Sequence, residues 1–396
     1  MTTEYQPKFS RASLNVLMIA CAALIVIFGQ TARQVSDKPL PPAPKLNISI
    51  WHTDSGAKVW YAPYFSEHIQ VQLWYDAGFA FDEEYKGRAQ LLAKLLKFES
   101  QQNELPTTIA LDQDYLKIGL ALSTHPTIMR SQIAQVAELL YRPQLSNGAL
   151  KLIRESQHSI QTHLREMAYG PHPYSGPMQG TTESLSSIDR KQLQRYLQTH
   201  VHPQRLHASI VGDIDEQAAQ VIMESLLPPS IHVAESKIPL PSLPVSSHEQ
   251  QEWILSIWPG LSAEDDSVPS KQPHATNIVD AQMVLHLLKQ VHGNLVHFSP
   301  GQKNSTLLIQ QASLLKQTMH DEINSDMIAR SKRQLAAHWL KQVNQAQSLS
   351  KYLVRLNAYE LAVNELDKNL AQLESWDEDR WETVSKQLLS PLTAGW

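Results

Sequence analysis

The chain has little cysteine and little charge. It contains one cysteine in 396 residues, Cys21, so it can form no internal disulfide framework and no cysteine-based zinc site. Charged residues make up 18% of the chain and the formal net charge is -5. Without a basic excess, nucleic-acid binding has no electrostatic support. Apolar residues make up 42%, which is enough for a buried core.

Residues 12–32 contain no charged side chain. A helix of that length can cross the roughly 30 Å hydrocarbon core of a bilayer. We therefore predict a tail at residues 1–11 and a single transmembrane anchor at 12–32 in the inner, cytoplasmic membrane. A cleaved signal peptide and a lipoprotein attached at Cys21 are the alternatives. Basic residues flank the span almost equally, and we expect a periplasmic body because a short tail before a large body is the usual signal-anchor layout.

Two proline-rich stretches divide the remainder of the chain. Residues 33–45 predict an extended linker that holds the body off the membrane, and residues 236–248 predict a second linker. The body would then consist of one domain at 46–235 and a shorter one at 249–396.

Strand and helix patterns alternate along the body, which predicts an α+β fold with antiparallel hairpins. A hairpin is expected at 46–61, around the turn Asp54-Ser55-Gly56. Further strands are predicted at 69–75, 116–122, 206–210, 253–258 and 306–311. Helices are predicted at 87–100, 127–141, 148–168, 189–200, 277–291, 325–345, 348–365 and 377–389. Tryptophans on or beside the strands are expected in core or strand-face positions, with an exposed aromatic patch for a partner as the alternative (Trp51, Trp60, Trp74, Trp253 and Trp258). The acidic run at 370–381 is expected to face solvent.

Several pieces of the first half resemble one family, the pitrilysin/insulinase (M16-like) zinc metallopeptidases. A strand HIQVQLWYDAG is followed by a glycine, Gly87, that opens an apolar helix. About 75 residues later, matching positions occur in the family's order: His172-Pro173-Tyr174, Gly176-Pro177, Gly180, Glu183, Leu193, Tyr196, Pro203 and Val211-Gly212-Asp213. The resemblance implies two M16-like α+β domains, the second of them truncated. It implies a packing role for His172-Pro173-Tyr174.

The family's chemistry resides in an HxxEH motif, in which two histidines one helical turn apart hold Zn²⁺ and a glutamate activates the bound water. The resemblance places Gln90 at the first histidine, Ala93 at the glutamate and Lys94 at the second histidine. An amide is a poor zinc ligand, an ammonium repels a metal cation, and a methyl group cannot take a proton. We therefore predict no catalytic residues, no bound metal and no cofactor.

Two further family features are also altered. The distal glutamate ligand would fall near residues 161–163, flanked by Glu155 and Glu166. The family's Arg–Tyr pair, which grips the substrate backbone, would fall at residues 292–300, where Gly293 and Leu295 fit loosely. The arginine is missing there, and His297 or Phe298 stands near the tyrosine position.

Two alternatives remain open for the altered site. Lys94 could pair with a carboxylate and hold the old site shut, or it could extend to solvent from the helix edge. Histidines could form a new metal site, with His158 and His163 or His200 and His202 as candidates, although neither spacing suits one helix face.

The sequence therefore predicts a membrane-anchored pseudopeptidase that pairs with an active pitrilysin/insulinase-family subunit or with itself. Peptides are possible ligands. Two other hypotheses are an active zinc peptidase with atypical ligands and a stand-alone peptide-binding or envelope scaffold.

Overall fold

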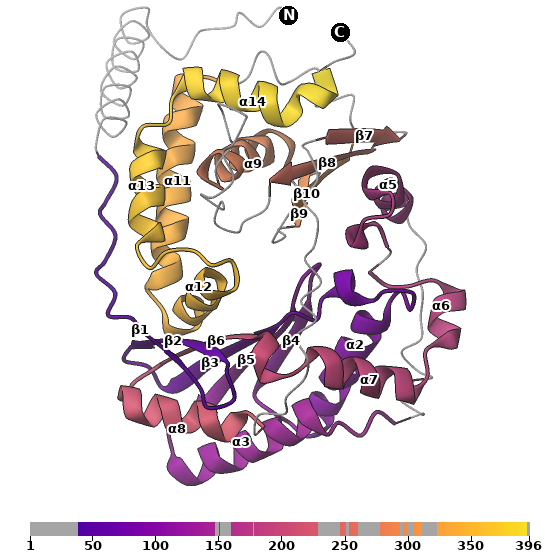
Figure 1. Ribbon diagram of the computed structural model, residues 1–396. Helices are drawn as coiled ribbons and strands as arrows, with labels where there is room; N and C mark the ends of the chain where they lie inside the picture. Colours follow the sequence, from indigo (N-terminus) through magenta and orange to yellow (C-terminus); the bar gives the residue numbers. More distant parts are fainter. Residues whose placement is uncertain are drawn as a thin grey trace, which may run out of the picture.

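The computed structural model describes residues 39–146, 150, 160–176, 178–228, 246–250, 253–259, 278–293, 296–299, 304–310 and 323–393 (Figure 1). The predicted anchor at 12–32 and the tail before it lie outside these residues. No helix in the described part of the chain has both the length and the apolar character needed to cross a membrane.

A mixed six-stranded sheet forms the first half of the molecule. Its strands are β1 (Ser49–His52), β2 (Lys58–Pro63), β3 (His68–Tyr75), β4 (Thr107–Leu111), β5 (Leu116–Ser123) and β6 (Leu206–Gly212), in the spatial order β1-β2-β6-β3-β5-β4. The β2–β6 pair is parallel and the other pairs are antiparallel. The predicted α+β class is confirmed, and so is the hairpin formed by β1 and β2.

One face of this sheet carries the first core. Alternate residues of β3 and β5 point to it because successive side chains of a strand point to opposite faces. The helices that cover this face are α2 (Arg88–Gln102), α3 (Pro126–Tyr141), α7 (Arg190–His200) and α8 (Glu216–Leu226). Fully buried leucines such as Leu92 and Leu95 place the apolar side of α2 against the sheet.

A second, four-stranded antiparallel sheet follows. It consists of β7 (Ser246–Gln250), β8 (Trp253–Pro259), β9 (Val296–Ser299) and β10 (Asn304–Gln310), in the order β7-β8-β10-β9. Helices α9 (Ile278–His292), α11 (Ser325–Val343), α12 (Ala346–Ala358), α13 (Glu365–Glu374) and α14 (Glu378–Thr393) accompany it. The predicted second linker ends inside β7, because residues 246–248 belong to that strand.

The two halves exchange helices. Helix α12 comes from the second half but packs across β2, β6 and β3 of the first sheet, on the face opposite α2 and α3. Helix α5 (Ile160–Tyr169) comes from the first half and packs on β7 and β8. As a consequence, Trp60, Ala62 and Val211 of the first sheet share one core with α9, α11 and α12. Neither sheet is covered by its own half alone.

The proline-rich segment after residue 38 is extended, as predicted, but it is no free spacer. Its apolar side chains pack against the core that the first sheet shares with α9, α11 and α12: Leu40, Ala43, Leu46 and Ile48. The segment runs beside α11 and α13 (Figure 1). The segment therefore contributes apolar surface to the folded body.

Several elements differ from the sequence prediction. The helix expected at 348–365 ends at Ala358, because Glu360 has a left-handed backbone with φ 56° and α13 begins only at Glu365. Other elements were not predicted: β4, β9, α8 and the short helix α6 (Thr182–Ser187). In α8, Asp215 accepts a hydrogen bond from the Ala218 N–H, which is a helix-start signal present in the sequence.

Candidate functional site

Helix α2, which carries Gln90, Ala93 and Lys94, begins at a glycine whose backbone conformation and surroundings disfavour any side chain. Gly87 has a φ of 88°, in the left-handed region that favours glycine. Its Cα lies close to the backbone of Gly180, and an added Cβ would be 2.7 Å from the Gly180 Cα. The buried Asp82 carboxylate accepts hydrogen bonds from the N–H groups of Gly87 at 2.8 Å and Ala89 at 2.7 Å. This cap satisfies two of the N–H groups that a helix start leaves unpaired.

Burial controls the protonation of that cap. It raises the pKa of the Asp82 carboxyl to about 7, against the lowering effect of the Ala89 and Gly87 N–H groups and of the Arg88 charge. The Arg88 guanidinium lies 4.6 Å from the centre of the Tyr196 ring and donates to the carbonyl oxygen of Phe81. These contacts fix the start of α2 against Phe81 and Tyr196.

Asp82 makes the stability depend on pH in a defined direction. Its folded pKa lies above the unfolded value of 3.8, so the folded state binds the proton more tightly between these values and stability is lost as pH rises towards 7. Relative to Asp82→Asn, the wild type should gain about 1.4 kcal/mol per pH unit as pH falls from 7 to 4.

Urea denaturation at pH 8, 6 and 5 measures this difference. Asp189→Asn, at the exposed start of α7, is the matched control and should show no such gain. Equal pH dependence of the Asp82→Asn variant and the wild type would contradict the proposed role of burial.

The motif positions present an amide, a methyl group and an ammonium on the side of α2. Gln90 and Lys94 are half-buried one helical turn apart, and Ala93 is buried. No side chain among the described residues forms a hydrogen bond or ion pair with Gln90 or Lys94. The hypothesis that Lys94 is held by a carboxylate therefore gains no support within the described residues.

The helix expected to carry the distal ligand is only partly described. Residues 161–163 lie in α5, but their side chains, and Glu155 altogether, lie outside the described residues. Glu166 is exposed. The His158–His163 hypothesis likewise falls outside the description. Within the described residues, no three His, Cys, Asp or Glu side chains lie close enough together to hold a metal ion.

His200 and His202 are used for packing and hydrogen bonding. The buried His200 ring accepts a hydrogen bond at Nδ1 from the Arg205 guanidinium, and burial together with Arg205 and Arg88 lowers its pKa to about 3. The His202 Nδ1 contacts the Gln204 Oε1 at 2.8 Å. Residues 292–300 contain β9, in which His297 is exposed and Phe298 is half-buried.

A buried polar network that the sequence did not predict links the two halves. The Arg165 guanidinium donates to the Gln113 Oε1 at 2.8 Å, and the Thr306 hydroxyl donates to the same oxygen at 3.2 Å. The Tyr169 hydroxyl lies 2.6 Å from the Thr306 hydroxyl. The only sequence signal was polar residues at turn and strand positions, which is too general to identify partners almost 200 residues apart.

The His172-Pro173-Tyr174 segment is structural, as the sequence indicated. The Tyr174 N–H donates to the His172 Nδ1 at 3.1 Å, and the Tyr174 hydroxyl donates to the buried carboxylate of Asp114. The Arg165 Nε donates to the Tyr174 carbonyl oxygen at 3.2 Å. This turn therefore fixes α5 to the first half.

Other sequence predictions about packing are confirmed where side chains are described. Trp60 and Trp74 are buried and Trp51 is half-buried, while the side chains of Trp253 and Trp258 lie outside the description. Leucines of α11 and α12 are buried: Leu335, Leu349, Leu353 and Leu356.

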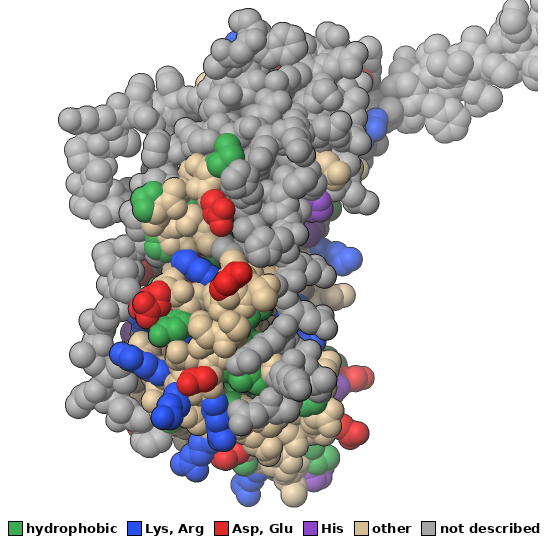
Figure 2. All heavy atoms as spheres, turned by 90° about the vertical axis from the view of Figure 1, so that its right-hand side faces the viewer, with side chains coloured by type: hydrophobic (Ala, Val, Ile, Leu, Met, Phe, Trp, Pro, Cys, Tyr) green, Lys and Arg blue, Asp and Glu red, His purple; other side chains and the backbone are tan. Residues whose placement is uncertain are grey.

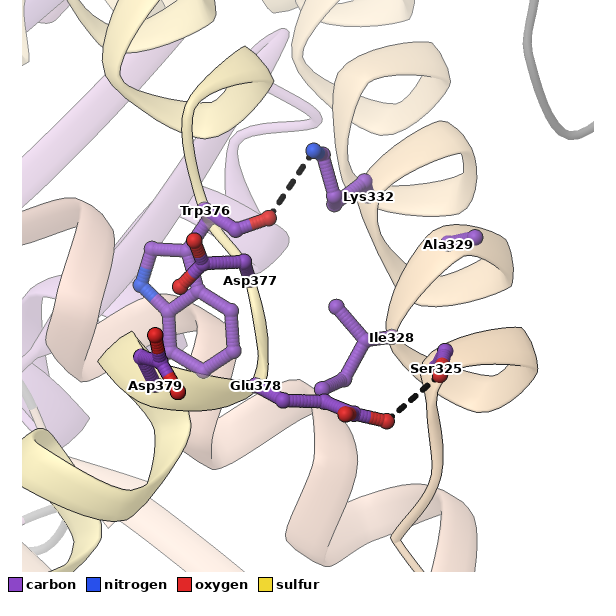
Figure 3. Close-up of a pocket in the computed structure, with 8 residues that line it drawn as sticks. All are labelled: Ser325, Ile328, Ala329, Lys332, Trp376, Asp377, Glu378 and Asp379. Carbon is purple, nitrogen blue, oxygen red and sulfur yellow. Dashed lines mark hydrogen bonds between the residues drawn. The ribbon is translucent and has the colours of Figure 1, made fainter.

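The acidic run between α13 and α14 is exposed, as predicted, and borders a hollow of about 380 Å³. Lys332 donates to the carbonyl oxygen of Trp376 at 2.9 Å and Ser325 donates to the Glu378 carboxylate (Figure 3). These bonds join α11 to the start of α14, so the polar groups serve to hold helices together.

Charges of both signs lie on the face that carries α5, α6 and α7. Figure 2 shows Lys and Arg side chains in the lower part of this face, with Asp and Glu side chains among them. The described side chains of this face form no extended patch of a single sign. The expectation that the protein does not bind nucleic acid stays a prediction.

Similar folds occur among solved structures. An inactive peptidase M16 domain from Pseudomonas fluorescens superposes with a TM-score of 0.67 at 15% identity, covering 86% of this chain and 94% of that one. The chain has the M16 peptidase fold. A Helicobacter pylori protease gives a TM-score of 0.65 at 14% identity over 88% of this chain and 97% of the other. No protein-family model and no curated protein sequence matches the chain.

A third similarity is to a longer chain. The periplasmic protease PqqL from Escherichia coli matches with a TM-score of 0.53 at 13% identity, over 90% of this chain but 50% of that one. The chain thus spans half the length of PqqL. The predicted resemblance to the pitrilysin/insulinase family is confirmed at the level of the fold.

Proposed function

We propose that this chain is a catalytically inactive M16-type pseudopeptidase that serves as the non-catalytic partner of an active zinc peptidase subunit. One observation carries the proposal: α2 offers Gln90, Ala93 and Lys94 where this chemistry needs two imidazoles and a carboxylate. These groups do not fit a zinc ion, because the donor set lacks a second ligand and a base. No step of a hydrolytic reaction can be routed through them.

Three related proposals complete this function. Residues 12–32 anchor the chain in the inner membrane, with the body in the periplasm. Residues 249–396 are the truncated counterpart of the first M16 domain, a relation supported by the mutual exchange of α5 and α12. Pairing is supported by PqqL, which is about twice as long as this chain, so that one copy would supply half of such an assembly.

The absence of zinc chemistry is tested by metal content and proteolysis. The purified full chain in mild detergent should contain no stoichiometric zinc by mass spectrometry and should cleave no unfolded protein substrate. The double variant Gln90→His, Lys94→His is the positive comparison. It should bind zinc at least about tenfold more tightly, because two imidazoles then share one helix face.

Chelator-sensitive cleavage by the wild type would overturn the proposal in favour of an active peptidase with atypical ligands. Loss of that activity on replacing His158 or His163 would identify those ligands.

The partner is tested separately. Affinity purification from membranes of the native host should recover a second protein with an intact HxxEH motif. Recovery of the chain as a lone monomer would contradict pairing and favour the stand-alone scaffold. Recovery of a dimer that contains only this chain would show that the chain pairs with itself and not with an active subunit.

A further inference from the structure

The second face of the six-stranded sheet is only partly covered. Helix α12 crosses β2, β6 and β3, and beyond it the sheet and the helix enclose a hollow of about 480 Å³. The floor consists of alternate residues of β3, β4 and β5, which point away from the first core. Residues of α12 and one residue of α11 form the wall. The lining consists of Gln72, Trp74, Thr108, Ala110, Lys117, Gly119, Gln342, Ser348, Lys351, Tyr352 and Arg355.

The floor is kept open by a glycine. A Cβ at Gly119 would lie 2.6 Å from the Thr108 hydroxyl and 2.9 Å from the Gln72 Nε2. These two polar side chains therefore lean over the glycine and present hydrogen-bonding groups to the hollow. Trp74 and Tyr352, both almost fully buried, add aromatic surface beside them.

The charges of the lining all have the same sign. Lys117, Lys351 and Arg355 are basic, and no lining residue is acidic. Lys117 is already neutralised, because it forms an ion pair with Asp112 and lies 4.0 Å from the centre of the Trp74 ring. The exposed Lys351 and the partly buried Arg355 have no such partner among the described residues.

Arg355 is the unusual group. Its Nη2 donates to the neutral amide oxygen of Gln342 at 3.1 Å, its guanidinium lies 5.3 Å from the centre of the Tyr352 ring, and its Nε is buried without an acceptor in the described structure. Burial lowers the pKa of Arg355, and the charge of Glu365, which forms no ion pair with it, acts in the opposite direction. The guanidinium therefore lines the hollow with a neutral amide as its only hydrogen-bonded side-chain partner among the described residues, and an anion in the hollow would supply the missing opposite charge.

We propose that this hollow binds an organic carboxylate, held by Arg355 and Lys351, with an apolar or aromatic part resting on Trp74 and Tyr352. Arginine presents paired N–H groups that match a carboxylate, and charge-assisted hydrogen bonds of this kind are the strong ones. The carboxylate could belong to a free organic acid or to the end of a peptide. The site lies on the sheet face opposite α2, so it does not depend on the state of the altered zinc motif.

Calorimetric titration of the full chain in mild detergent tests the site. N-acetylphenylalanine is the probe and its neutral amide is the matched comparison. The carboxylate should bind at least about tenfold more tightly than the amide, because only the carboxylate completes the guanidinium. Equal affinity for the two probes would overturn the proposal.

Variants locate the binding. Arg355→Gln should weaken binding of the carboxylate by about tenfold or more, and Lys351→Gln by about threefold. Arg330→Gln removes the same charge from an exposed position of α11 and should leave the affinity unchanged. Because Lys351 is exposed, its variant should fold even if Arg355→Gln does not. Unchanged affinity in the folded Lys351 and Arg355 variants would refute the site.

A pentapeptide ending in phenylalanine distinguishes the two sources. Binding at least about tenfold tighter than N-acetylphenylalanine would assign the hollow to peptide ends. Equal affinity would assign it to small organic acids. Either result supports the carboxylate site, and neither depends on whether the protein pairs with a peptidase.

Discussion

The Asn357→Asp variant should lose about 3–5 kcal/mol of unfolding free energy at neutral pH, although the substitution changes one amide into a carboxylate of the same shape. Asn357 lies on α12 and is 1% exposed. Its Nδ2 donates to the carbonyl oxygens of Lys58 at 2.9 Å and Ala208 at 3.2 Å. These oxygens belong to the neighbouring strands β2 and β6. A carboxylate there would place negative charge against two acceptors.

The effect should spread to both halves, because α12 belongs to the second half and covers the sheet of the first. Two further bonds secure the same contact: Ser209 donates to the Ser350 carbonyl oxygen at 2.6 Å, and Tyr115 donates to that of Ala358 at 2.9 Å. Amide hydrogen exchange should therefore accelerate in both sheets of the variant. Urea denaturation followed by tryptophan fluorescence should remain a single transition at a lower midpoint.

Asn364→Asp provides the control, since it is the same change at the exposed start of α13. It should alter stability by less than about 0.5 kcal/mol. The penalty of Asn357→Asp should also shrink in acid, where the introduced carboxyl becomes a neutral donor. Loss of protection in the second sheet alone would show that the exchanged helix does not couple the halves.

The second large effect concerns acid stability. Replacing His200 by asparagine should make the protein progressively more stable, relative to wild type, as pH falls below 6.5. The folded pKa of His200 is lowered to about 3 from 6.5, first by burial and then by Arg205 and Arg88. The unfolded chain therefore binds a proton that the folded chain rejects, and stability falls with pH in this window. The difference should reach about 2.7 kcal/mol over two pH units.

Asparagine suits this test because its Oδ1 can still accept the hydrogen bond from Arg205. The variant loses ring contacts with Tyr196 and Phe81, whose ring centres lie 4.4 Å and 5.5 Å from that of His200. It should therefore be less stable than wild type at pH 8, and only the slope against pH carries the prediction. His125→Asn, at an exposed position, should leave the slope unchanged.

The pH dependence of the wild-type unfolding free energy would not by itself reveal the effect of His200. Asp82 acts in the opposite direction, since its raised pKa adds stability as pH falls below about 7. The two groups face the same arginine, Arg88, and their effects partly cancel between pH 4 and 6.5. Parallel unfolding curves of the His200→Asn variant and wild type from pH 8 to 5 would refute the role of His200.

Period-two and helical patterns in the sequence predicted most elements of the first half, although β4, α6 and α8 were missed. The alternation in β3 and β5 predicted strands with one apolar face, and that face does pack against α2 and α3. The chemistry of the altered motif also followed from the sequence, because it depends only on which groups one helical turn presents. The boundary at Glu360 was missed, since the left-handed residue that ends α12 is not a glycine.

Local patterns in the sequence determined the α+β class, the apolar face of the first sheet, and the amide, methyl and ammonium groups at residues 90, 93 and 94, whereas the M16-like fold was inferred from a resemblance. The class, the apolar face and the three side chains follow from local periodicity or from the chemistry of single residues. Only the tertiary structure decided that α12 partly covers the second face of the first sheet, and that Arg355 meets Gln72 and Trp74 across a hollow. These groups come together because the two halves exchange helices over nearly 300 residues of chain, a long-range packing that no local pattern records.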